Sequence, residues 1–527
     1  MKGLIPTLLC DFYKVSHREQ YPAGTEVVYS TWVPRSGKHA PNIKHVVAFG
    51  FQGFIKEFMI DYFNENFFAR NKDEVLAEYS RYMKFCLQVQ NPDTSHIEAL
   101  HDLGYLPLKI KALDEGTLVP FRVPMLTIEN TDSRFFWLTN YFETLMSANL
   151  WKPATSASIA KEYRDLLDSY AKKTTGSTDF VMFQGHDFSM RGMSGLEDSA
   201  RTGAGHLLSF VGTDTIPAIQ YLEQYYNANI EKELVGCSVN ATEHSVMCAG
   251  GKDDEFETYR RLIEDTYPTG IVSIVSDTWD LWHVLTDTIP KLKEKILARD
   301  GGPESLDKVV IRPDSGDPVK ILCGDNDAPM NSPANKGVIQ LLWETFGGTV
   351  NKEGYKELNP AIGAIYGDAI TLDRCGHICD RLETQGFAST NVVFGIGSYT
   401  YQMNTRDTLG FAMKATSVVI NGVEMPIFKN PVTDDGVKKS NLGRVAVIEN
   451  SAGNLVCVDD NSHQSVVKSA QNCNLLTDVF VDGKLVKETT LQEVKSKMVS
   501  EEDRVSGFSM SLKAAKMELE HGIGTEG

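Results

Sequence analysis

The sequence predicts an α/β fold built on a parallel β-sheet, because apolar runs, polar ends and helix-like segments alternate along its middle part. The apolar runs that end in charged or turn-forming residues are 270–280, 309–319, 360–370 and 391–400. Helical patterns fill the segments between them, which are 278–297, 335–346 and 371–387. This repetition indicates βα units. In α/β barrels such strand ends converge on one mouth, although a doubly wound sheet also fits the pattern.

The run at 309–319, VVIRPDSGDPV, has the densest polar end, with Arg312, Asp314 and Ser315 directly after the apolar residues. The stretch 178–192 ends in a similar way and predicts a further strand, followed by Asp187 and Arg191. A proline, a glycine and small polar residues would serve a turn by themselves. For any single carboxylate, turn capping is the simpler interpretation. Several ends of the same character favour a ligand site.

The flanks of this central part have a different pattern. Residues 25–33 predict a strand, residues 50–70 a helix, and Asn421-Gly422 a tight hairpin within 416–429. Further hairpins are expected over 444–459 and 478–486. We therefore expect three parts: a mixed α+β part over 1–175, the α/β barrel over 176–404, and a β-rich part over 405–527 that packs with the first.

Composition excludes several classes of protein. The chain has 527 residues, a formal net charge of −18 and nine cysteines without a zinc-site or disulfide pattern. The negative charge disfavours nucleic acid and anionic membranes as partners. With no long apolar stretch and a poor signal peptide at its start, the chain is expected to be cytoplasmic and without a membrane partner.

The predicted strand ends combine two kinds of chemistry. Carboxylates suit sugar hydroxyls or Mg²⁺, while arginines and glycine-rich turns suit phosphate oxygens. Together they predict a site for a phosphorylated sugar. An aldolase or isomerase acting on sugar phosphates is a weaker alternative, because it would want a Schiff-base lysine or a catalytic carboxylate at a strand end.

Ten segments, in order along nearly the whole chain, resemble the nicotinamide phosphoribosyltransferase family. They include DFYKVSHREQYP at 11–22, HDFSMRG at 186–192, TEHS at 242–245, IRPDSGDP at 311–318 and FKNPVTDD at 428–435. The resemblance implies the fold of type II phosphoribosyltransferases, an irregular α/β barrel with flanking parts from both chain ends. It also implies a head-to-tail homodimer with shared active sites.

The reaction implied by the resemblance joins nicotinamide to phosphoribosyl pyrophosphate, giving nicotinamide mononucleotide and pyrophosphate for NAD biosynthesis. Mg²⁺ and ATP are implied as cofactor and coupled co-substrate, with ATP acting through a phosphorylated histidine. His244 matches that histidine, and Glu243 beside it is expected to orient it. Exact Mg²⁺ ligands are not implied, although Asp277 and Asp314 are candidates.

The resemblance also assigns substrate contacts. Phe188 and the partner subunit's Tyr13 would stack on the pyridine ring, with Asp214, Ser273 and Arg312 bound to its amide. The ribose hydroxyls would bind Asp314, Gly367 and Asp368. The 5′-phosphate would bind Gly397, Ser398 and, from the partner, Arg406 and Lys414. The pyrophosphate or ATP phosphates would face Arg35, Arg191, Lys429 and Lys438.

The sequence departs from the family pattern at three places, and none touches the base-reading set. Ser398 stands where the family has a glycine, Ala412 replaces a serine, and Ser189-Met190 replaces Gly-Tyr. A nicotinate phosphoribosyltransferase is the alternative enzyme, but the carboxylate of Asp214 would repel nicotinate. A regulatory or scaffold protein that only binds phosphate is the non-enzymatic alternative.

Overall fold

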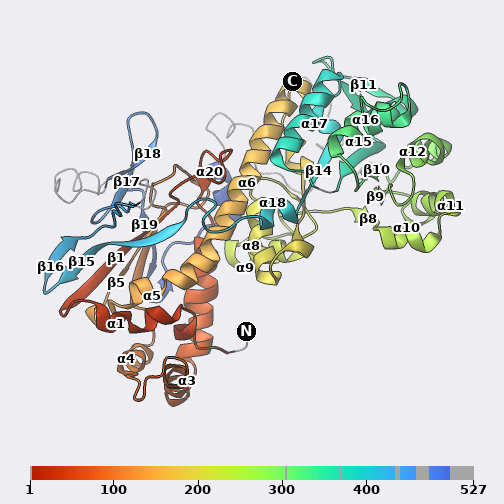
Figure 1. The fold of residues 1–527 in the computed structure, drawn as a ribbon. Coiled ribbons are helices and arrows are strands. Elements are labelled where there is room, and N and C mark those ends of the chain that lie inside the picture. Colours follow the sequence, from red (N-terminus) through yellow and green to blue (C-terminus); the bar gives the residue numbers. More distant parts are fainter. Residues whose placement is uncertain (1–2, 303–304, 368, 434–438, 459–473, 499–527) are drawn as a thin grey trace. The chain divides into compact units, whose positions relative to one another are not determined.

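A computed structural model describes residues 3–302, 305–367, 369–433, 439–458 and 474–498 (Figure 1). Two of the predicted site residues, Asp368 and Lys438, lie outside these ranges. The described residues divide into two compact units. Unit 1 contains 3–158, 221–228 and 404–498, and unit 2 contains 159–220 and 229–403 with the same gaps. The long helix α6 (Glu143–Thr175) contributes residues to both.

Unit 2 is built on a parallel sheet in which the strand order is β7-β6-β14-β13-β10-β9-β8. The strands are β6 (Gly185–Phe188), β7 (Gly212–Thr213), β8 (Asn240–Ala241), β9 (Ile271–Val275), β10 (Lys308–Arg312), β13 (Ile362–Tyr366) and β14 (Val392–Gly397). Cys237, just before β8, bridges to Gly212 in β7. The segment 237–241 thus contacts both edge strands, and the sheet forms the irregular α/β barrel that the resemblance implies rather than a doubly wound sheet.

Helices alternate with the strands along the chain, as expected of βα units. They are α7 (Val181–Gln184), η6 (Met190–Gly192), α8 (Leu196–His206), α9 (Ile216–Tyr226), α10 (His244–Gly250), α11 (Glu255–Arg260), η7 (Arg261–Thr266), α12 (Leu281–His283), η8 (Val284–Thr288), α13 (Ile289–Lys291), α14 (Lys293–Leu297), α15 (Pro318–Cys323), α16 (Pro333–Phe346), α17 (Leu372–Thr384), η9 (Ser389–Asn391) and α18 (Ser398–Gln402). A small antiparallel pair, β11 (Gly348–Val350) and β12 (Lys356–Leu358), follows α16.

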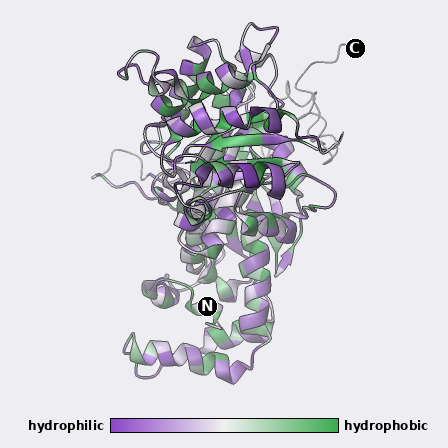
Figure 2. Ribbon diagram, turned by 90° about the vertical axis from the view of Figure 1, so that its right-hand side faces the viewer, coloured by the Kyte–Doolittle hydropathy of each residue, from purple (hydrophilic) through white to green (hydrophobic). Residues whose placement is uncertain are grey.

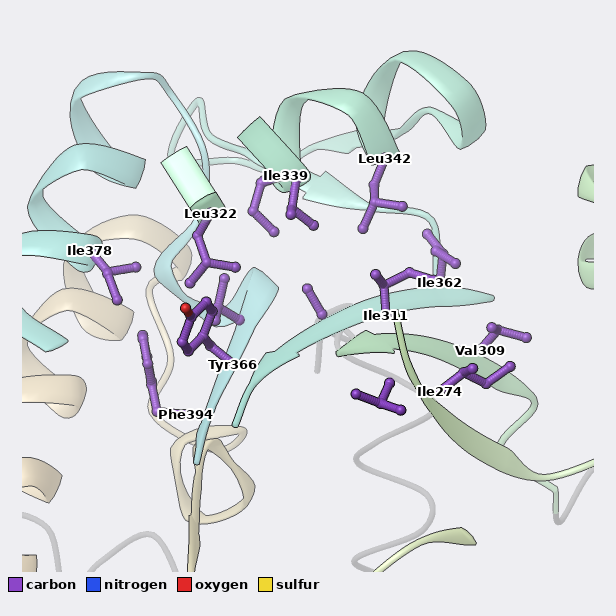
Figure 3. Packing of buried hydrophobic residues seen from close by; sticks show 14 of the residues in the cluster. Ile274, Val309, Ile311, Leu322, Ile339, Leu342, Ile362, Tyr366, Ile378 and Phe394 are labelled. Carbon is purple, nitrogen blue, oxygen red and sulfur yellow. The ribbon is translucent and has the colours of Figure 1, made fainter. Parts of the chain in front are cut away.

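The core of unit 2 lies between these strands and helices (Figure 3). Val309 and Ile311 of β10 are fully buried and belong to the same apolar cluster as Leu322 of α15, Leu342 of α16 and Ile378 of α17. Successive side chains of a strand point to opposite faces of the sheet. Because Val309 and Ile311 are two residues apart, their side chains point to the same face. In Figure 2 the helices carry both apolar and polar bands, as expected for helices with one buried face.

One predicted strand is partly wrong. The apolar start of 178–192 forms the short helix α7, and the strand β6 begins only at Gly185. A short apolar run cannot be assigned to helix or strand by periodicity alone. The charged end of this segment nevertheless lies at the end of a strand, as expected.

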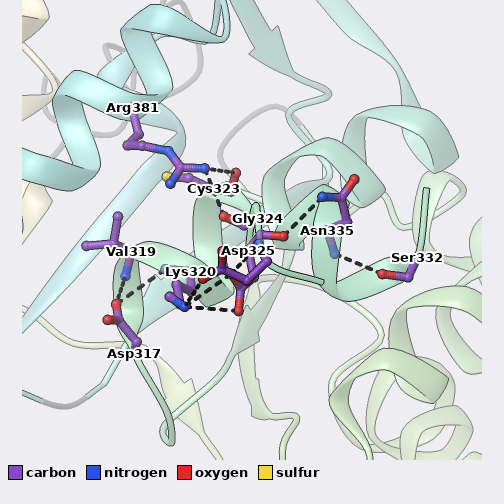
Figure 4. A network of polar contacts seen from close by, with 10 residues as sticks. Asp317, Val319, Lys320, Cys323, Gly324, Asp325, Ser332, Asn335 and Arg381 are labelled. Atoms are coloured by element: carbon purple, nitrogen blue, oxygen red, sulfur yellow. Dashed lines mark hydrogen bonds and ion pairs between the residues drawn. The ribbon is translucent and has the colours of Figure 1, made fainter. Parts of the chain in front are cut away.

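The turn after β10 continues into a network of polar contacts at α15 (Figure 4). Asp317 caps this helix by accepting from the backbone N–H groups of Val319 and Lys320 at 2.9 and 3.3 Å. Lys320 in turn contacts Asp325 at 3.2 Å. For Asp317, turn capping is therefore what the structure shows, and Asp314 has a different environment described below.

Unit 1 is built on an antiparallel sheet in which the strand order is β16-β15-β1-β5-β3-β19-β20. Its strands are β1 (Thr25–Val33), β3 (Leu108–Ala112), β5 (Leu126–Asn130), β15 (Ala412–Ile420), β16 (Val423–Pro426), β19 (Thr477–Val481) and β20 (Lys484–Leu485). Smaller pairs are β2 (Val46–Val47) with β4 (Leu118–Val119), and β17 (Ala446–Glu449) with β18 (Leu455–Val458). All three predicted hairpins are confirmed.

The helices of unit 1 come mostly from the N-terminal part of the chain, with one from the C-terminal part. They are η1 (Pro6–Leu8), η2 (Phe12–Ser16), α1 (His17–Gln20), α2 (Phe51–Phe54), η3 (Ile55–Tyr62), η4 (Asn64–Phe68), α3 (Lys72–Phe85), α4 (Ser95–Leu103), η5 (Ser133–Phe135), α5 (Leu138–Tyr141) and α20 (Leu491–Met498). The predicted helix over 50–70 corresponds to α2, η3 and η4. Across the described residues, no helix is long and apolar enough to cross a membrane.

Candidate active site

The carboxyl ends of the parallel strands bring most of the predicted base and sugar residues to one edge of the sheet in unit 2. Neighbouring strands run in register; for example, Arg312 of β10 pairs with Val275 of β9. The residues that end or follow the seven strands, in sheet order, are Asp214, Phe188, Gly397, Gly367, Arg312, Asp277 and His244. The edge therefore offers a carboxylate acceptor, an aromatic ring, two glycines that leave the backbone accessible, a guanidinium and an imidazole.

Asp214 follows β7 and accepts two hydrogen bonds on the same oxygen. Its Oδ1 accepts from His186 Nε2 at 2.9 Å and from Ser238 Oγ at 2.6 Å. Burial acts to raise the pKa of Asp214, but the bonds from His186 and Ser238 and the charge of Arg312 outweigh it and hold the pKa below its ordinary value. Asp214 is therefore an ionised acceptor at neutral pH.

Phe188 ends β6 and lies against a glycine of the neighbouring strand. A Cβ at Gly395 would come within 2.6 Å of the Phe188 ring, so a larger residue there would displace the ring. His186, two residues earlier, has its ring centre 4.6 Å from that of Phe188. Because His186 also donates to Asp214, it joins the aromatic ring and the acceptor that the resemblance assigns to the base.

Three buried polar atoms on adjacent strands have no hydrogen-bond partner within the described part of the chain. They are Ser273 Oγ in β9, Arg312 Nε at the end of β10 and Asp277 Oδ1 after β9. Buried polar atoms are nearly always hydrogen-bonded. The same guanidinium of Arg312 also donates through Nη2 to the carbonyl of Thr242. These three atoms are therefore available to bind polar groups of a ligand.

Asp314 lies in the turn after β10, next to the end of β13. A Cβ at Gly367 would be 2.2 Å from Asp314 Oδ1, so the glycine makes room for this carboxylate. The backbone N–H of Asp314 donates to Asp277 Oδ2 at 3.0 Å, and Ser315 Oγ donates to the same atom. Asp277 thus holds the turn that presents Asp314.

His244 is the first residue of α10 and has a half-exposed side chain. Its Nε2 lies 3.8 Å from Asp314 Oδ2 and 3.9 Å from Asp277 Oδ1, and its Nδ1 lies 3.3 Å from Thr278 Oγ1. The expected orienting residue, Glu243, instead accepts from Ser245 Oγ. Thr278 thus lies within hydrogen-bond distance of one ring nitrogen of His244, and the two aspartates lie near the other.

The turn between β14 and α18 carries Gly397 and Ser398, and it lies against the turn that carries Arg191. A Cβ at Gly192 would be 2.2 Å from Ser398 Oγ and 2.4 Å from its Cβ. The serine that departs from the family pattern therefore occupies space that Gly192 leaves open. The side chain of Arg191 is exposed at this place.

The remaining predicted residues, Tyr13, Arg35, Arg406, Lys414 and Lys429, all belong to unit 1. Tyr13 is 59% exposed, and its pKa is raised by burial and by Glu143 and Asp11, with Arg406 opposing. Burial lowers the pKa of Lys414, Glu143 acts to raise it, and the nearby charges of Arg35 and Lys429 lower it further. Unit 1 thus gathers an exposed aromatic ring and four cations.

Glu143 at the start of α6 holds part of this cationic group in place. It accepts from Lys14 and, at 3.4 Å, from Lys414 Nζ. Burial acts to raise the pKa of Glu143, but the two lysines outweigh it and lower the pKa. Arg35 Nε donates to the carbonyl of Gly410 at 2.8 Å. Ala412, the second departure from the family pattern, is buried at the start of β15.

A protein-only metal site is absent from the described residues, where no three acidic, histidine or cysteine side chains are suitably grouped. Mg²⁺ usually binds through one or two carboxylates together with substrate phosphates. Asp277 and Asp314 fit that pattern, because they adjoin each other and Asp277 Oδ1 is buried without a hydrogen-bond partner in the described structure.

Sequence reasoning did not assign roles to His186, Ser238 or Thr278, which contact Asp214 and His244. They come from neighbouring strands or turns, so only the strand order reveals them. Asp187 was grouped with the carboxylates suited to sugar or Mg²⁺. It is fully buried, and its side chain is bound to protein groups instead.

The fold is that of type II phosphoribosyltransferases, as the resemblance predicted. A crystal structure of nicotinate-nucleotide pyrophosphorylase from Pyrococcus furiosus matches 94% of this chain and 94% of its own, with a TM-score of 0.53 and 14% identity. The sequence pattern of the nicotinate phosphoribosyltransferase (NAPRTase) family matches residues 183–483. That of the N-terminal domain of nicotinamide phosphoribosyltransferase matches residues 6–110.

The chain is also similar in sequence, over most of its length, to two proteins named as nicotinamide phosphoribosyltransferases. The nicotinamide phosphoribosyltransferase of Acinetobacter baylyi is 54% identical over 501 residues, which are 94% of this chain and 97% of the relative. That of Mycoplasma pneumoniae is 36% identical over 83% of this chain and 94% of its own length. The chain therefore belongs to the nicotinamide phosphoribosyltransferase family.

Proposed function

We propose that this protein is an enzyme that transfers the phosphoribosyl group of phosphoribosyl pyrophosphate to nicotinamide, forming nicotinamide mononucleotide and pyrophosphate in NAD salvage. Family membership supports the reaction. The single observation that carries the choice of base is the ionised acceptor Asp214, held by His186 and Ser238 near the Phe188 ring.

The carboxamide of nicotinamide presents one donor group and one acceptor. Its NH₂ would donate to Asp214, and its oxygen would accept from Ser273 Oγ and Arg312 Nε, two atoms without a partner in the described structure. Nicotinate has no such donor, and its carboxylate would face Asp214. Leaving buried polar groups mispaired is the strongest means of discrimination a pocket has.

In the reaction, the pyridine nitrogen attacks the anomeric carbon as the bond to pyrophosphate breaks, and positive charge develops on the sugar. Such a step depends on positioning and electrostatic stabilisation more than on proton transfer. The Phe188 ring would align the base, and Asp314 with the backbone of Gly367 would hold the ribose hydroxyls. The carboxylates near the sugar would favour the developing charge. Asp368 is assigned to the same hydroxyls by the resemblance alone.

Mg²⁺ would be held by Asp277 and Asp314 together with the pyrophosphate, and it would neutralise the charge of the leaving group. The protein's own cations for the phosphates are Arg191 in unit 2 and Arg35, Arg406, Lys414 and Lys429 in unit 1, with Lys438 assigned by resemblance. Gly397 and Ser398 would bring backbone N–H groups and a hydroxyl to the 5′-phosphate.

We further infer a head-to-tail homodimer in which the partner's Tyr13, Arg406 and Lys414 complete each site. The exposed ring of Tyr13 supports this, because an aromatic side chain that is 59% exposed is available to stack on a ligand. Glu143 keeps Lys414 near the cationic group, so unit 1 presents a preformed anion-binding surface.

ATP would act by transferring its γ-phosphoryl group to His244, with ADP as the leaving group. Nε2 of His244 faces two carboxylates, so a phosphate on this histidine would change the charge next to the sugar-binding Asp314 and the candidate Mg²⁺ ligand Asp277. The expected effect is tighter binding of phosphoribosyl pyrophosphate and faster release of pyrophosphate.

Two assays test the proposal. Formation of nicotinamide mononucleotide from nicotinamide and phosphoribosyl pyrophosphate is measured with and without ATP, with nicotinate as the competing base; preference for nicotinate or absence of product would refute it. For the dimer, inactive Tyr13→Ala and Asp314→Ala proteins are mixed. Random exchange should restore about a quarter of the sites, and no recovery after verified exchange would refute shared sites.

A further inference from the structure

Asp187 is a buried carboxylate that the reaction described above does not use. It occupies the third position of β6, between His186 and Phe188, and has no exposed surface. Since alternate side chains of a strand point to opposite faces, Asp187 points away from the side that His186 and Phe188 share. Burying a carboxylate is costly unless it is hydrogen-bonded, so its partners indicate what it is kept for.

Its partners belong to the two turns that carry base-binding residues. Oδ1 accepts from the backbone N–H of Ser189 at 2.9 Å, and this residue opens the turn after β6. Oδ2 accepts from Thr213 Oγ1 at 3.3 Å, in the last residue of β7. Thr213 Oγ1 in turn accepts from the backbone N–H of Thr215 at 2.9 Å. One carboxylate thus connects the ends of two neighbouring strands.

The residue between Thr213 and Thr215 is Asp214. Its backbone N–H donates to the carbonyl of Asp187 at 3.0 Å, and β6 and β7 pair Asp187 directly with Thr213. The Asp214 turn is therefore attached to Asp187 through its backbone and through Thr213. The only side chain that both turns share among these contacts is that of Asp187.

The helix behind the strands is shaped to admit this carboxylate. A Cβ at Gly203 of α8 would be 3.1 Å from Asp187 Oδ2 and 2.6 Å from Ala218 Cβ. The 2.6 Å contact requires movement of α9 and the 3.1 Å contact is tight, so any larger residue at 203 would press on α9 and crowd the carboxylate. The space around Asp187 Oδ2 is thus preserved by a glycine.

We propose that Asp187 is a positioning residue of the nicotinamide site, which fixes the acceptor Asp214 relative to the Phe188 ring by binding both strand ends from behind. This rests on the proposed function, and it assigns a role to a residue that touches no substrate. Small displacements of binding groups suffice, since about 1 Å of misplacement can cost about 100-fold in rate.

The test separates the two hydrogen bonds of the Asp187 carboxylate, to Ser189 and to Thr213, in the full-length enzyme. Thr213→Val removes the hydroxyl that connects Asp187 to the Asp214 turn and keeps the side-chain shape. We expect KM for nicotinamide to rise about tenfold and KM for phosphoribosyl pyrophosphate to stay within about twofold. Thr213→Ser keeps the hydroxyl and is the matched control, and its KM for nicotinamide should stay close to the wild-type value.

Asp187→Asn disturbs both hydrogen bonds, because an amide offers one acceptor oxygen where the protein presents two donors. KM should rise for nicotinamide and, through the Ser189 turn that precedes Arg191, for phosphoribosyl pyrophosphate. The ratio of kcat/KM for nicotinamide to kcat/KM for nicotinate should be smaller in both Asp187→Asn and Thr213→Val than in the wild type. A role limited to folding would lower the melting temperature and leave these ratios unchanged.

Equal KM values for nicotinamide in Thr213→Val, Thr213→Ser and wild type would overturn the proposal, even if Asp187→Asn does not fold. Calorimetric titration of nicotinamide into the same proteins gives the comparison without turnover. If the wild type binds nicotinamide but forms no nicotinamide mononucleotide, the proposed function fails. The affinities of the variants for nicotinamide, compared with that of the wild type, still decide the role of Asp187.

Discussion

Replacing Asp214 by asparagine should move the enzyme's preference from nicotinamide towards nicotinate. The substitution keeps the size of the side chain and one oxygen that can accept from His186 and Ser238, which now bind Oδ1 at 2.9 and 2.6 Å. It removes the negative charge and can present an NH₂ group to the base. Nicotinamide then loses its acceptor, whereas the carboxylate of nicotinate gains a donor next to Arg312.

The expected size follows from the bond that is lost. A hydrogen bond to a charged group contributes about 1.5–3 kcal/mol, which corresponds to about 10- to 150-fold in kcat/KM. Since 45% of the Asp214 side chain is exposed, solvent screening places the loss for nicotinamide near the lower end. The gain for nicotinate adds to this, so the ratio of the two kcat/KM values should change by more than tenfold.

The assay compares kcat/KM for both bases in wild type and Asp214→Asn at fixed phosphoribosyl pyrophosphate and Mg²⁺. Asp179→Asn is the matched control, because Asp179 is exposed and its carboxylate accepts from Ser177 Oγ at 2.6 Å, outside the proposed site. With its pKa held below the ordinary value, Asp214 loses its charge only as the pH falls through that lowered pKa. The wild-type ratio should therefore be constant from about pH 6 to 8.

Two results would refute the reasoning. A wild type that already prefers nicotinate would show that Asp214 does not select the amide. A ratio of kcat/KM values that barely moves in a folded Asp214→Asn protein would show that the carboxylate does not contact the base.

Three further predictions concern other parts of the molecule. His244→Ala should abolish ATP stimulation and leave slow, ATP-independent transfer; normal ATP hydrolysis with retained stimulation would contradict this. Gly192→Ala should raise KM for phosphoribosyl pyrophosphate several-fold, because its methyl group would meet Ser398 at 2.2 Å, and Ser398→Gly should restore it in the double variant; additive effects would argue against the contact. Burial raises the pKa of Glu115 to about 7, although hydrogen bonds from Gln52, Gly50 and Tyr226 act to lower it. The protonated Glu115 therefore stabilises the fold fully below the pKa of the unfolded chain. This contribution to the free energy of unfolding, up to about 3 kcal/mol, is lost as the pH rises from there through 7. Melting temperatures should fall as the pH rises from about 4.5 to about 7 and level off above that, and Glu115→Gln should flatten that slope; an equal slope in the variant would assign the effect elsewhere.

Local chemistry explains which parts of the fold could be predicted from the sequence. Asn421 and Gly422 have φ values of 50° and 76°, and Asp482 and Gly483 have 47° and 79°. These are left-handed conformations that Asn, Asp and Gly adopt most readily, so both hairpins could be read from dipeptides. The strand ends were recognisable for a similar reason, since an apolar run and its polar end are adjacent in the chain.

The features that escaped prediction depend on which strands become neighbours. His186 and Asp214 are separated along the chain and meet because β6 pairs with β7. Asp187 resembles a ligand in the sequence as much as Asp314 does. Only the placement of α8 behind β6 shows that one carboxylate faces the protein interior while the other faces the site edge. The short helix α7 illustrates the remaining limit, because its apolar residues suit a strand equally well.

The antiparallel sheet of unit 1 has a consequence for the synthesis of the chain. Strand β1 ends at Val33 and pairs along its whole length with β15, which ends at Ile420. At about 5–20 residues per second, a ribosome would need about 20–80 s between these two points. Throughout that interval one edge of β1 has no partner, whereas every strand of unit 2 has already been synthesised before β15 is made. Unit 1 is therefore the part of the nascent chain that most needs a chaperone, and a protein truncated before residue 412 would leave that edge open to aggregation.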